Sequence, residues 1–374
     1  MSRSLHPMHI LAFAAACVLV AELFGLKIPQ SETGIPQDEA VIRTFSGMSG
    51  VSAAAILSDD VFVVTSDTSN VLHFYQKNGP VSPMASLDLT SFIGSALEAQ
   101  KISIRAAARV ENRIYWISSF GYDQDSKGQI NEFCFFATRI IVLGHQWTLE
   151  PEGTPCTTLG EALLRLPVFH QDGFDQTVGS KGNNDKRLSP TRNIINIEAL
   201  CDAPDGKTLY LGLCSPHPEG KAVVVPLLNA SAVIDKQEIP AFGAPLFWDL
   251  QGLGLRSLEY SPHHGRCFAL AGFHDGRDGG VLYEWSGNPA DPPQLIGPIL
   301  PDVPDFTSEA LVIFTGPEGL WFFSDDGSRL IDIASPAECL PGKSRDGHCE
   351  NKYLTDFNKK TFRGAKLMPQ WPKS

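Results

Sequence analysis

The sequence is poor in charge, and poorest in basic residues. Only 19% of its 374 residues are charged, and 30 Lys and Arg stand against 42 Asp and Glu, which gives a formal net charge of -12. Nucleic acids and anionic lipid surfaces are bound by clustered Lys and Arg. The composition therefore argues against a nucleic-acid-binding surface and favours cations or neutral molecules as partners.

Two further absences narrow the fold class. The 33 Gly and 27 Pro have no three-residue period, which disfavours collagen, and they are too widely spread for a long helical bundle. Hydrophobic residues make up 43% of the chain, so wholesale disorder is excluded. Many short strands joined by turns fit this composition best.

The first 28 residues are predicted to be a signal peptide or an N-terminal anchor. Arg3 precedes an apolar run from Ile10 to Leu26, which contains one charge, Glu22. This run is too short and too interrupted for a typical transmembrane helix. This pattern is typical of secretory signals. We expect a periplasmic or secreted bacterial protein, and an uncleaved anchor, the only expected membrane contact, is the alternative.

The cysteines contain no C-x-x-C pair of the zinc or thioredoxin kind. Disulfides fit an exported protein better than a zinc or redox site does, and two short loops suggest pairs of cysteines that are close in the sequence. Cys267 is left over as a small buried residue in a strand. The predicted pairs are Cys201 with Cys214, Cys339 with Cys349, and Cys134 with Cys156.

A repeat of about fifty residues runs through the rest of the chain, in the range typical of propeller blades. Each copy has a strand, a tight turn and a second apolar strand that ends in a small residue. The spacing from the Glu of the first strand, or from the Arg or Ala in its place, to the small residue that ends the second strand is nearly constant. The copies begin at Ser52–Ala54, Ser103–Ala106, Asn196–Leu200, Ser257–Tyr260 and Ser308–Leu311.

These repeats predict an all-β fold, a β-propeller of about six blades, within a range of five to seven. Residues 44–368 are expected to form one domain, with a helical and loop insertion at about 145–192. That insertion, together with the chain ends, would supply the sixth blade. Phe362–Leu367 is expected to be a closing strand beside the N-terminal segment, which would cover an open sheet edge.

Several phrases of the sequence resemble a bacterial family called domain of unknown function 3616. The resemblance spans roughly residues 45–367 and implies a propeller, but no catalytic residues. Arg105 and Ala53 depart from the family pattern, which has acidic residues there, so a complete acidic ring is not expected. The matching phrases are Asn196–Leu200, Gly220–Leu227, Gly254–Tyr260, Ala271–Gly276, Ser324–Gly327 and Phe362–Gly364.

Charged residues are expected to converge where inner strands begin and second strands end. Three carboxylates around one narrow opening must bind a cation, pair with basic groups or hold protons. The predicted metal ligands, with calcium as the possible ion, are Glu198, Glu259 and Glu309. The predicted ligand-binding residues are Arg105, Glu198, Arg256, Glu259, His274, Glu309, Asp67 and Asp325.

The arginines leave an internal Arg–Glu network open as an alternative to a metal site. The predicted function is an exported platform that binds a small molecule or a protein on its upper axial face, which is the end of the propeller where inner strands begin and second strands end. The alternative is a cation-dependent hydrolase, a phosphoesterase or esterase similar to phytase-like propellers by fold analogy alone. Whether the chain is an enzyme stays open, because a hydrolase needs carboxylates free of Arg and no catalytic residue is identified.

Overall fold

The computed structural model describes residues 41–97, 102–119, 133–144, 146–170, 195–273, 280–300, 303–314 and 319–367. The predicted signal or anchor at residues 1–28 lies outside this set, as does His274. No helix within the described segments is long and apolar enough to cross a membrane.

The described chain contains five four-stranded antiparallel sheets, each of which is one blade. A short sixth sheet of two strands lies outside the blades. The first blade contains β2 (Ala53–Ile56), β3 (Val61–Thr65), β4 (Val71–Gln76) and β5 (Ala85–Asp88), and the second β6 (Ile104–Val110), β7 (Arg113–Ser118), β8 (Phe135–Leu143) and β9 (Gln146–Cys156). The third contains β10 (Asn196–Asp202), β11 (Leu209–Ser215), β12 (Ala222–Leu227) and β13 (Leu246–Trp248), and the fourth β14 (Gly254–Ser261), β15 (Arg266–Gly272), β16 (Gly280–Trp285) and β17 (Gln294–Ile299).

The fifth blade joins the two ends of the described chain. It contains β18 (Ser308–Ile313), β19 (Leu320–Ser324), β22 (Thr361–Leu367) and, at its outer edge, β1 (Val41–Ser46). Strand β1 pairs with β22 along its whole length, so the predicted closing strand is confirmed. This pairing covers the edge of β22 that would otherwise be open.

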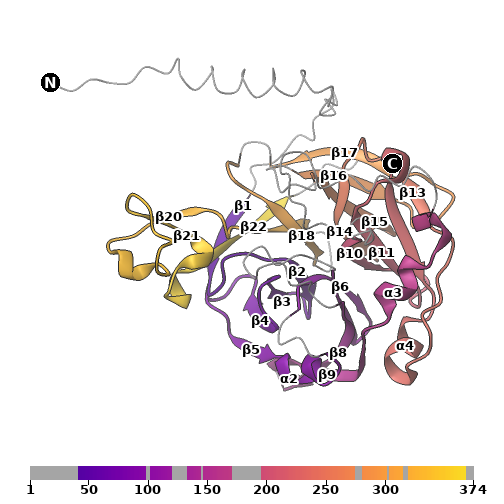
Figure 1. Cartoon of the computed structure of the whole chain (residues 1–374), viewed down its shortest axis with the longest axis horizontal. Coiled ribbons are helices and arrows are strands. Elements are labelled where there is room, and N and C mark those ends of the chain that lie inside the picture. The colour runs from indigo at the N-terminus through magenta and orange to yellow at the C-terminus, as the bar shows by residue number, and fades with distance from the viewer. Residues whose placement is uncertain are drawn as a thin grey trace, which may run out of the picture. The chain divides into compact units, whose positions relative to one another are not determined.

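The innermost strands β2, β6, β10, β14 and β18 contact one another in this order, and β18 contacts β2 again. Figure 1 shows these five strands around the centre of the ring. Five hydrophobic clusters fill the five interfaces between consecutive blades. The second strands are apolar on both faces because each blade lies between two others, which explains their continuous apolar runs.

The blade count lies at the lower end of the predicted range, because the segment expected to supply a sixth blade completes the second one. Strands β8 and β9 form a long hairpin there. Helix α3 (Leu159–Leu164) and a 3-10 turn, Pro167–His170, follow β9. The other α-helices of the described segments are α2 (Thr90–Gly94), after the first blade, and α4 (Ala230–Lys236), between β12 and β13.

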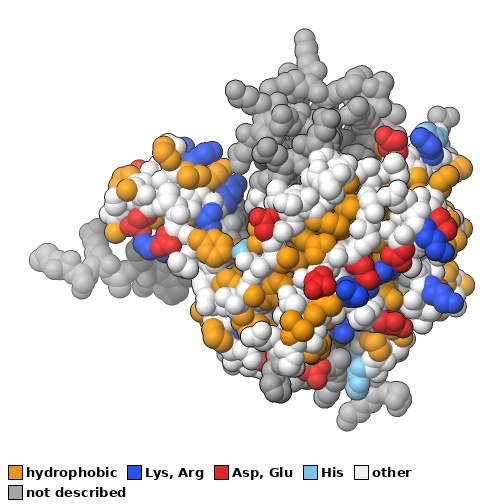
Figure 2. Space-filling model, turned by 90° about the horizontal axis from the view of Figure 1, so that it is seen from below, with side chains coloured by type: hydrophobic (Ala, Val, Ile, Leu, Met, Phe, Trp, Pro, Cys, Tyr) orange, Lys and Arg blue, Asp and Glu red, His pale blue; other side chains and the backbone are white. Residues whose placement is uncertain are grey.

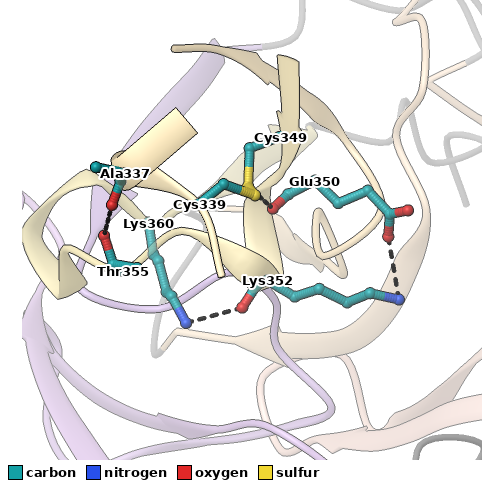
Figure 3. Close-up of a disulfide and its surroundings, with 7 residues drawn as sticks. All are labelled: Ala337, Cys339, Cys349, Glu350, Lys352, Thr355 and Lys360. Carbon is teal, nitrogen blue, oxygen red and sulfur yellow. Dashed lines mark hydrogen bonds and ion pairs between the residues drawn. A yellow bond between two sulfur atoms is a disulfide. The ribbon is translucent and has the colours of Figure 1, made fainter. Parts of the chain in front are cut away.

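A lobe closed by a disulfide lies between β19 and β22 of the fifth blade, and it projects at the left of the space-filling view in Figure 2. It contains β20 (Leu330–Asp332), β21 (His348–Glu350) and three 3-10 turns, at Pro336–Glu338, Asn351–Tyr353 and Phe357–Lys359. The predicted disulfide between Cys339 and Cys349 is confirmed, with their Cα atoms 5.8 Å apart. Figure 3 shows this disulfide between the lobe's short elements, where the Cys349 sulfur contacts the Glu350 carbonyl.

The other two predicted disulfides are wrong, because β-sheet geometry separates their members. Cys201 pairs in register with Tyr210, so Cys214 lies near the opposite end of the hairpin. Cys134 packs in the cluster between the first and second blades, whereas Cys156 packs against the cluster between the second and third. Successive residues of a strand point to opposite faces, so Cys134 points away from the face that carries Phe135 and its partner Cys156. All four are free thiols, and Cys267 is a buried free thiol, as predicted.

Candidate functional site

Four inner strands carry a bulge near their first residues, and a charged residue occupies each bulge. The register with the second strand skips Arg105 in β6, Glu198 in β10, Arg256 in β14 and Glu309 in β18. A bulged residue has no partner across the strand pair, and the bulge re-aims its side chain. The first blade has no such shift in β2, where Ala53 pairs with Thr65.

Arg256 holds two of these carboxylates together. Its Nη1 lies 2.6 Å from Oε1 of Glu309 and 3.0 Å from Oε2 of Glu198. Its Nη2 donates a hydrogen bond to the backbone carbonyl of Phe273. All three side chains are at most 11% exposed, so this is a buried triad in which one guanidinium group contacts two carboxyl groups.

Arg105 lies on the other side of Glu198 and is more open to solvent. Its Nη2 lies 3.1 Å from Oδ2 of Asp67, and its Nη1 is 4.0 Å from Oε1 of Glu198. Its Nε donates to the Ser103 hydroxyl, and the Asn196 amide donates to the Glu198 carboxylate over 2.7 Å. The Arg105 and Asp67 side chains are 26% and 34% exposed, so they form the accessible part of the group.

Asp325 adds a fourth carboxyl group directly after β19. Its Oδ1 accepts a hydrogen bond from the Gly327 amide over 2.9 Å. Gly50 forms an isolated bridge with Asp325, and a Cβ atom at Gly50 would lie only 2.0 Å from Oδ1 of Asp325. Only glycine therefore fits at position 50 with Asp325 in this place. We call Asp67, Arg105, Glu198, Arg256, Glu309 and Asp325 the axial cluster.

Burial and excess negative charge raise carboxyl pKa values in the axial cluster. The pKa of Glu309 is raised to about 8, mainly because the buried side chain loses its hydration. The nearby Glu198 and Asp325 raise it further, and Arg256 lowers it by less than these effects together. The pKa of Asp325 is also raised, mainly by the protein atoms packed around it, although solvent reaches its side chain. Burial lowers the pKa of Arg105, but nearby carboxylates, led by Asp67, outweigh this effect and raise it. The cluster thus combines two guanidinium groups with four carboxyl groups, at least one of which favours its protonated form at neutral pH.

The structure brings together six of the eight residues predicted to bind a ligand, which are the six of the axial cluster. Glu259 is not among them, since it lies three residues beyond Arg256 on β14 and pairs in register with Phe268. There burial raises its pKa well above the ordinary value, and nearby Asp202 adds to this effect. His274 falls outside the described residues.

The three predicted metal ligands do not converge, because Arg256 occupies the bulge position assigned to Glu259. Glu198 and Glu309 instead share Arg256. Across the described segments, no group of three or more His, Cys, Asp or Glu side chains is arranged to hold a metal ion. The internal Arg–Glu network therefore describes the observed contacts of these two carboxylates, and a calcium site stays a prediction.

Sequence reasoning missed Ser103 and Asn196, which orient the Arg105 and Glu198 side chains, and it missed the bulge. A signal for the bulge exists in the sequence. Each bulged residue is charged and precedes a small residue, in the triplets Ile104–Ala106, Ile197–Ala199, Leu255–Ser257 and Ser308–Ala310. Aligning the repeats on these triplets would have placed Arg256, and not Glu259, in the ring.

Solved structures that are similar to this chain include three at very low sequence identity. A Bacteroides ovatus protein provisionally assigned as a hydrolase has 8% identity and a TM-score of 0.44, and the match covers 91% of this chain and 96% of that one. Inulosucrase from Halalkalicoccus jeotgali, bound to kestose, has 13% identity and a TM-score of 0.42, with coverages of 80% and 81%. The WD40 propeller domain of Doa1 has 10% identity and a TM-score of 0.29, with coverages of 78% and 67%. No protein-family model and no curated protein sequence matches the chain.

Proposed function

We propose that the protein is an exported propeller that binds a small molecule or a protein on its upper axial face, the end where inner strands begin and second strands end. The observation that carries this proposal is the construction of the axial cluster. Four inner strands use a bulge to bring charged side chains together. Burying charges is unfavourable, so a cluster of this kind is a natural candidate for a functional site.

The accessible part of the cluster is the expected contact surface. Arg105 and Asp67 are partly exposed and Asp325 is exposed, whereas Glu198, Arg256 and Glu309 are buried behind them. The buried triad holds its members in place through short contacts with Arg256. A ligand would therefore meet one guanidinium and two carboxylates on a rigid base, which suits a polar molecule that both donates and accepts hydrogen bonds.

Binding is better supported than hydrolysis. A cation-dependent hydrolase needs several carboxylates free of arginine, and here Glu198 and Glu309 both contact Arg256. Asp67 is also paired, with Arg105. Charge pairing of this extent is compatible with a binding platform, and it leaves Asp325 as the cluster's only carboxyl group without an ion pair in the described part of the chain.

Thermal unfolding of the purified protein against a panel of small molecules tests the proposal. The panel contains amines, carboxylates, sugars, phosphate esters and calcium, because a ligand of the folded state raises the unfolding midpoint. We expect at least one compound to raise the midpoint of the wild type and of Arg139→Ala, but not that of Arg105→Ala. Arg139 is a matched control, since it forms an exposed ion pair with Glu150 on the second blade.

Two outcomes would count against this function. Compounds that raise the midpoint equally in Arg105→Ala would place binding elsewhere on the protein. A rise with calcium that Asp325→Asn abolishes would favour the cation-dependent alternative and lead to a phosphoesterase and esterase screen.

A further inference from the structure

Two buried cysteine thiols face each other across the interface between the third and fourth blades. Cys201 is on the inner strand β10 of the third blade, and Cys267 is on the second strand β15 of the fourth. Both belong to the hydrophobic cluster between these blades and are at most 1% exposed. The Cys201 thiol donates a hydrogen bond to the Asp202 carbonyl over 3.1 Å, and the two cysteines lie in the same cluster on facing sides of the interface.

The strand registers place the two thiols opposite each other. Cys201 pairs with Tyr210 in the third blade, and Cys267 pairs with Trp285 in the fourth. Side chains of residues that pair across two strands lie on the same face of the sheet. The Tyr210 and Trp285 rings meet edge to face across the interface, with centroids 5.0 Å apart. The two cross-strand pairs therefore face each other, with the cysteines on the side nearer the inner strands.

We propose that Cys201 and Cys267 form a disulfide between the third and fourth blades when the chain folds under oxidising conditions. Each thiol loses a proton, one S–S bond forms, and the two electrons pass to a disulfide oxidant such as glutathione disulfide. The S–S bond of the oxidant is cleaved, and its two sulfur atoms leave as thiols. Such a bond would be a covalent link between two blades that are already joined by packing and by the ion pair of Arg256 with Glu198.

Oxidation has to occur before the two blades close on each other. In the folded protein both thiols are buried, and burial raises the pKa of Cys201, with additional effects from Cys267, Asp202 and Glu259. Thiol exchange proceeds through the thiolate, so a buried thiol of this kind reacts slowly with an oxidant in solution. Folding from the reduced, unfolded chain is therefore the appropriate starting point for a test.

The test is a disulfide map after oxidative refolding. The reduced, denatured chain is refolded in a mixture of reduced and oxidised glutathione, remaining thiols are alkylated in denaturant, and the peptides are identified by mass spectrometry. We expect a peptide that joins Cys201 to Cys267, in addition to the one that joins Cys339 to Cys349. Alkyl groups are then expected on Cys134, Cys156 and Cys214, the other free thiols of the described chain.

The proposal is overturned if Cys201 and Cys267 are both alkylated while Cys339 and Cys349 are linked. A link between Cys201 and Cys214 would overturn it as well. Cys201→Ala should convert Cys267 from the linked to the alkylated form, whereas the matched variant Cys156→Ala should leave the link unchanged. The wild-type map decides the question by itself if the Cys201 variant does not fold.

Discussion

Replacing Glu309 by Gln should change how the stability of the protein depends on pH. The Glu309 side chain is 11% exposed, and its pKa is raised from the ordinary 4.5 to about 8, first by burial and then by Glu198 and Asp325. Between these two pH values the folded state binds a proton that the unfolded state has released. The free energy of unfolding therefore falls as pH rises through this window.

The size of this contribution follows from the pKa values. A rise from 4.5 to about 8 corresponds to about 5 kcal/mol, at about 1.4 kcal/mol for each pH unit. The carboxyl group is buried, so solvent screening does not reduce this figure strongly. Glutamine has nearly the same shape and no charge to lose, so the variant should lack this decline and become more stable relative to the wild type as pH rises toward 9.

Urea unfolding at several pH values between 4 and 9 measures this effect. The quantity to follow is the difference in free energy of unfolding between variant and wild type, because Asp202 and Glu259 also have raised pKa values and contribute to both curves. Glu161→Gln is the control, since Glu161 is 70% exposed and makes only a surface ion pair. If the Glu309→Gln curve runs parallel to that of the wild type, Glu309 is ionised throughout and the reasoning is refuted.

Three further variants, one of them a double substitution, test other contacts. Arg256→Met leaves two buried carboxylates without their cation and should cost about 3–5 kcal/mol, with a larger loss at pH 9 than at pH 6, as measured by urea unfolding. Asn351→Ala removes a fully buried amide that donates to the carbonyls of Asp326 and Thr361, and should cost about 2–4 kcal/mol and make the lobe sensitive to limited proteolysis. Cys339 and Cys349, both changed to Ala, should cost about 2–3 kcal/mol, since the disulfide closes a short loop. Unchanged protease resistance of the lobe would contradict the last two expectations.

Local patterns in the sequence predicted a large part of the fold. The repeated strand–turn–strand unit predicted the blades because buried strands need continuous apolar runs, and these runs recur along the chain. The closing strand at Phe362–Leu367 was predicted from the need to cover a sheet edge, and β1 covers it. The disulfide between Cys339 and Cys349 was predictable because a short loop keeps its two ends close.

The candidate site was predicted less completely because register is a property of strand pairs. Glu198 and Glu259 occupy similar places in the linear repeat, yet only Glu198 lies at a bulge. One residue of slip reverses the face of every following side chain, so an alignment that ignores bulges misplaces charged residues. The predicted pair of Cys201 and Cys214 failed for a different reason, because the register from the turn places Tyr210 opposite Cys201 and leaves Cys214 four residues further along β11.

The sequence by itself therefore determined the repeat, the closure and the kinds of charged residue at the axis, because these depend on local composition and chain order. The tertiary structure decided which of those residues meet. Arg256 lies between Glu198 and Glu309, and Cys201 shares a buried cluster with Cys267, only because neighbouring blades pack face to face. These contacts join residues far apart in the chain, and their geometry depends on the bulges and registers of several sheets at once.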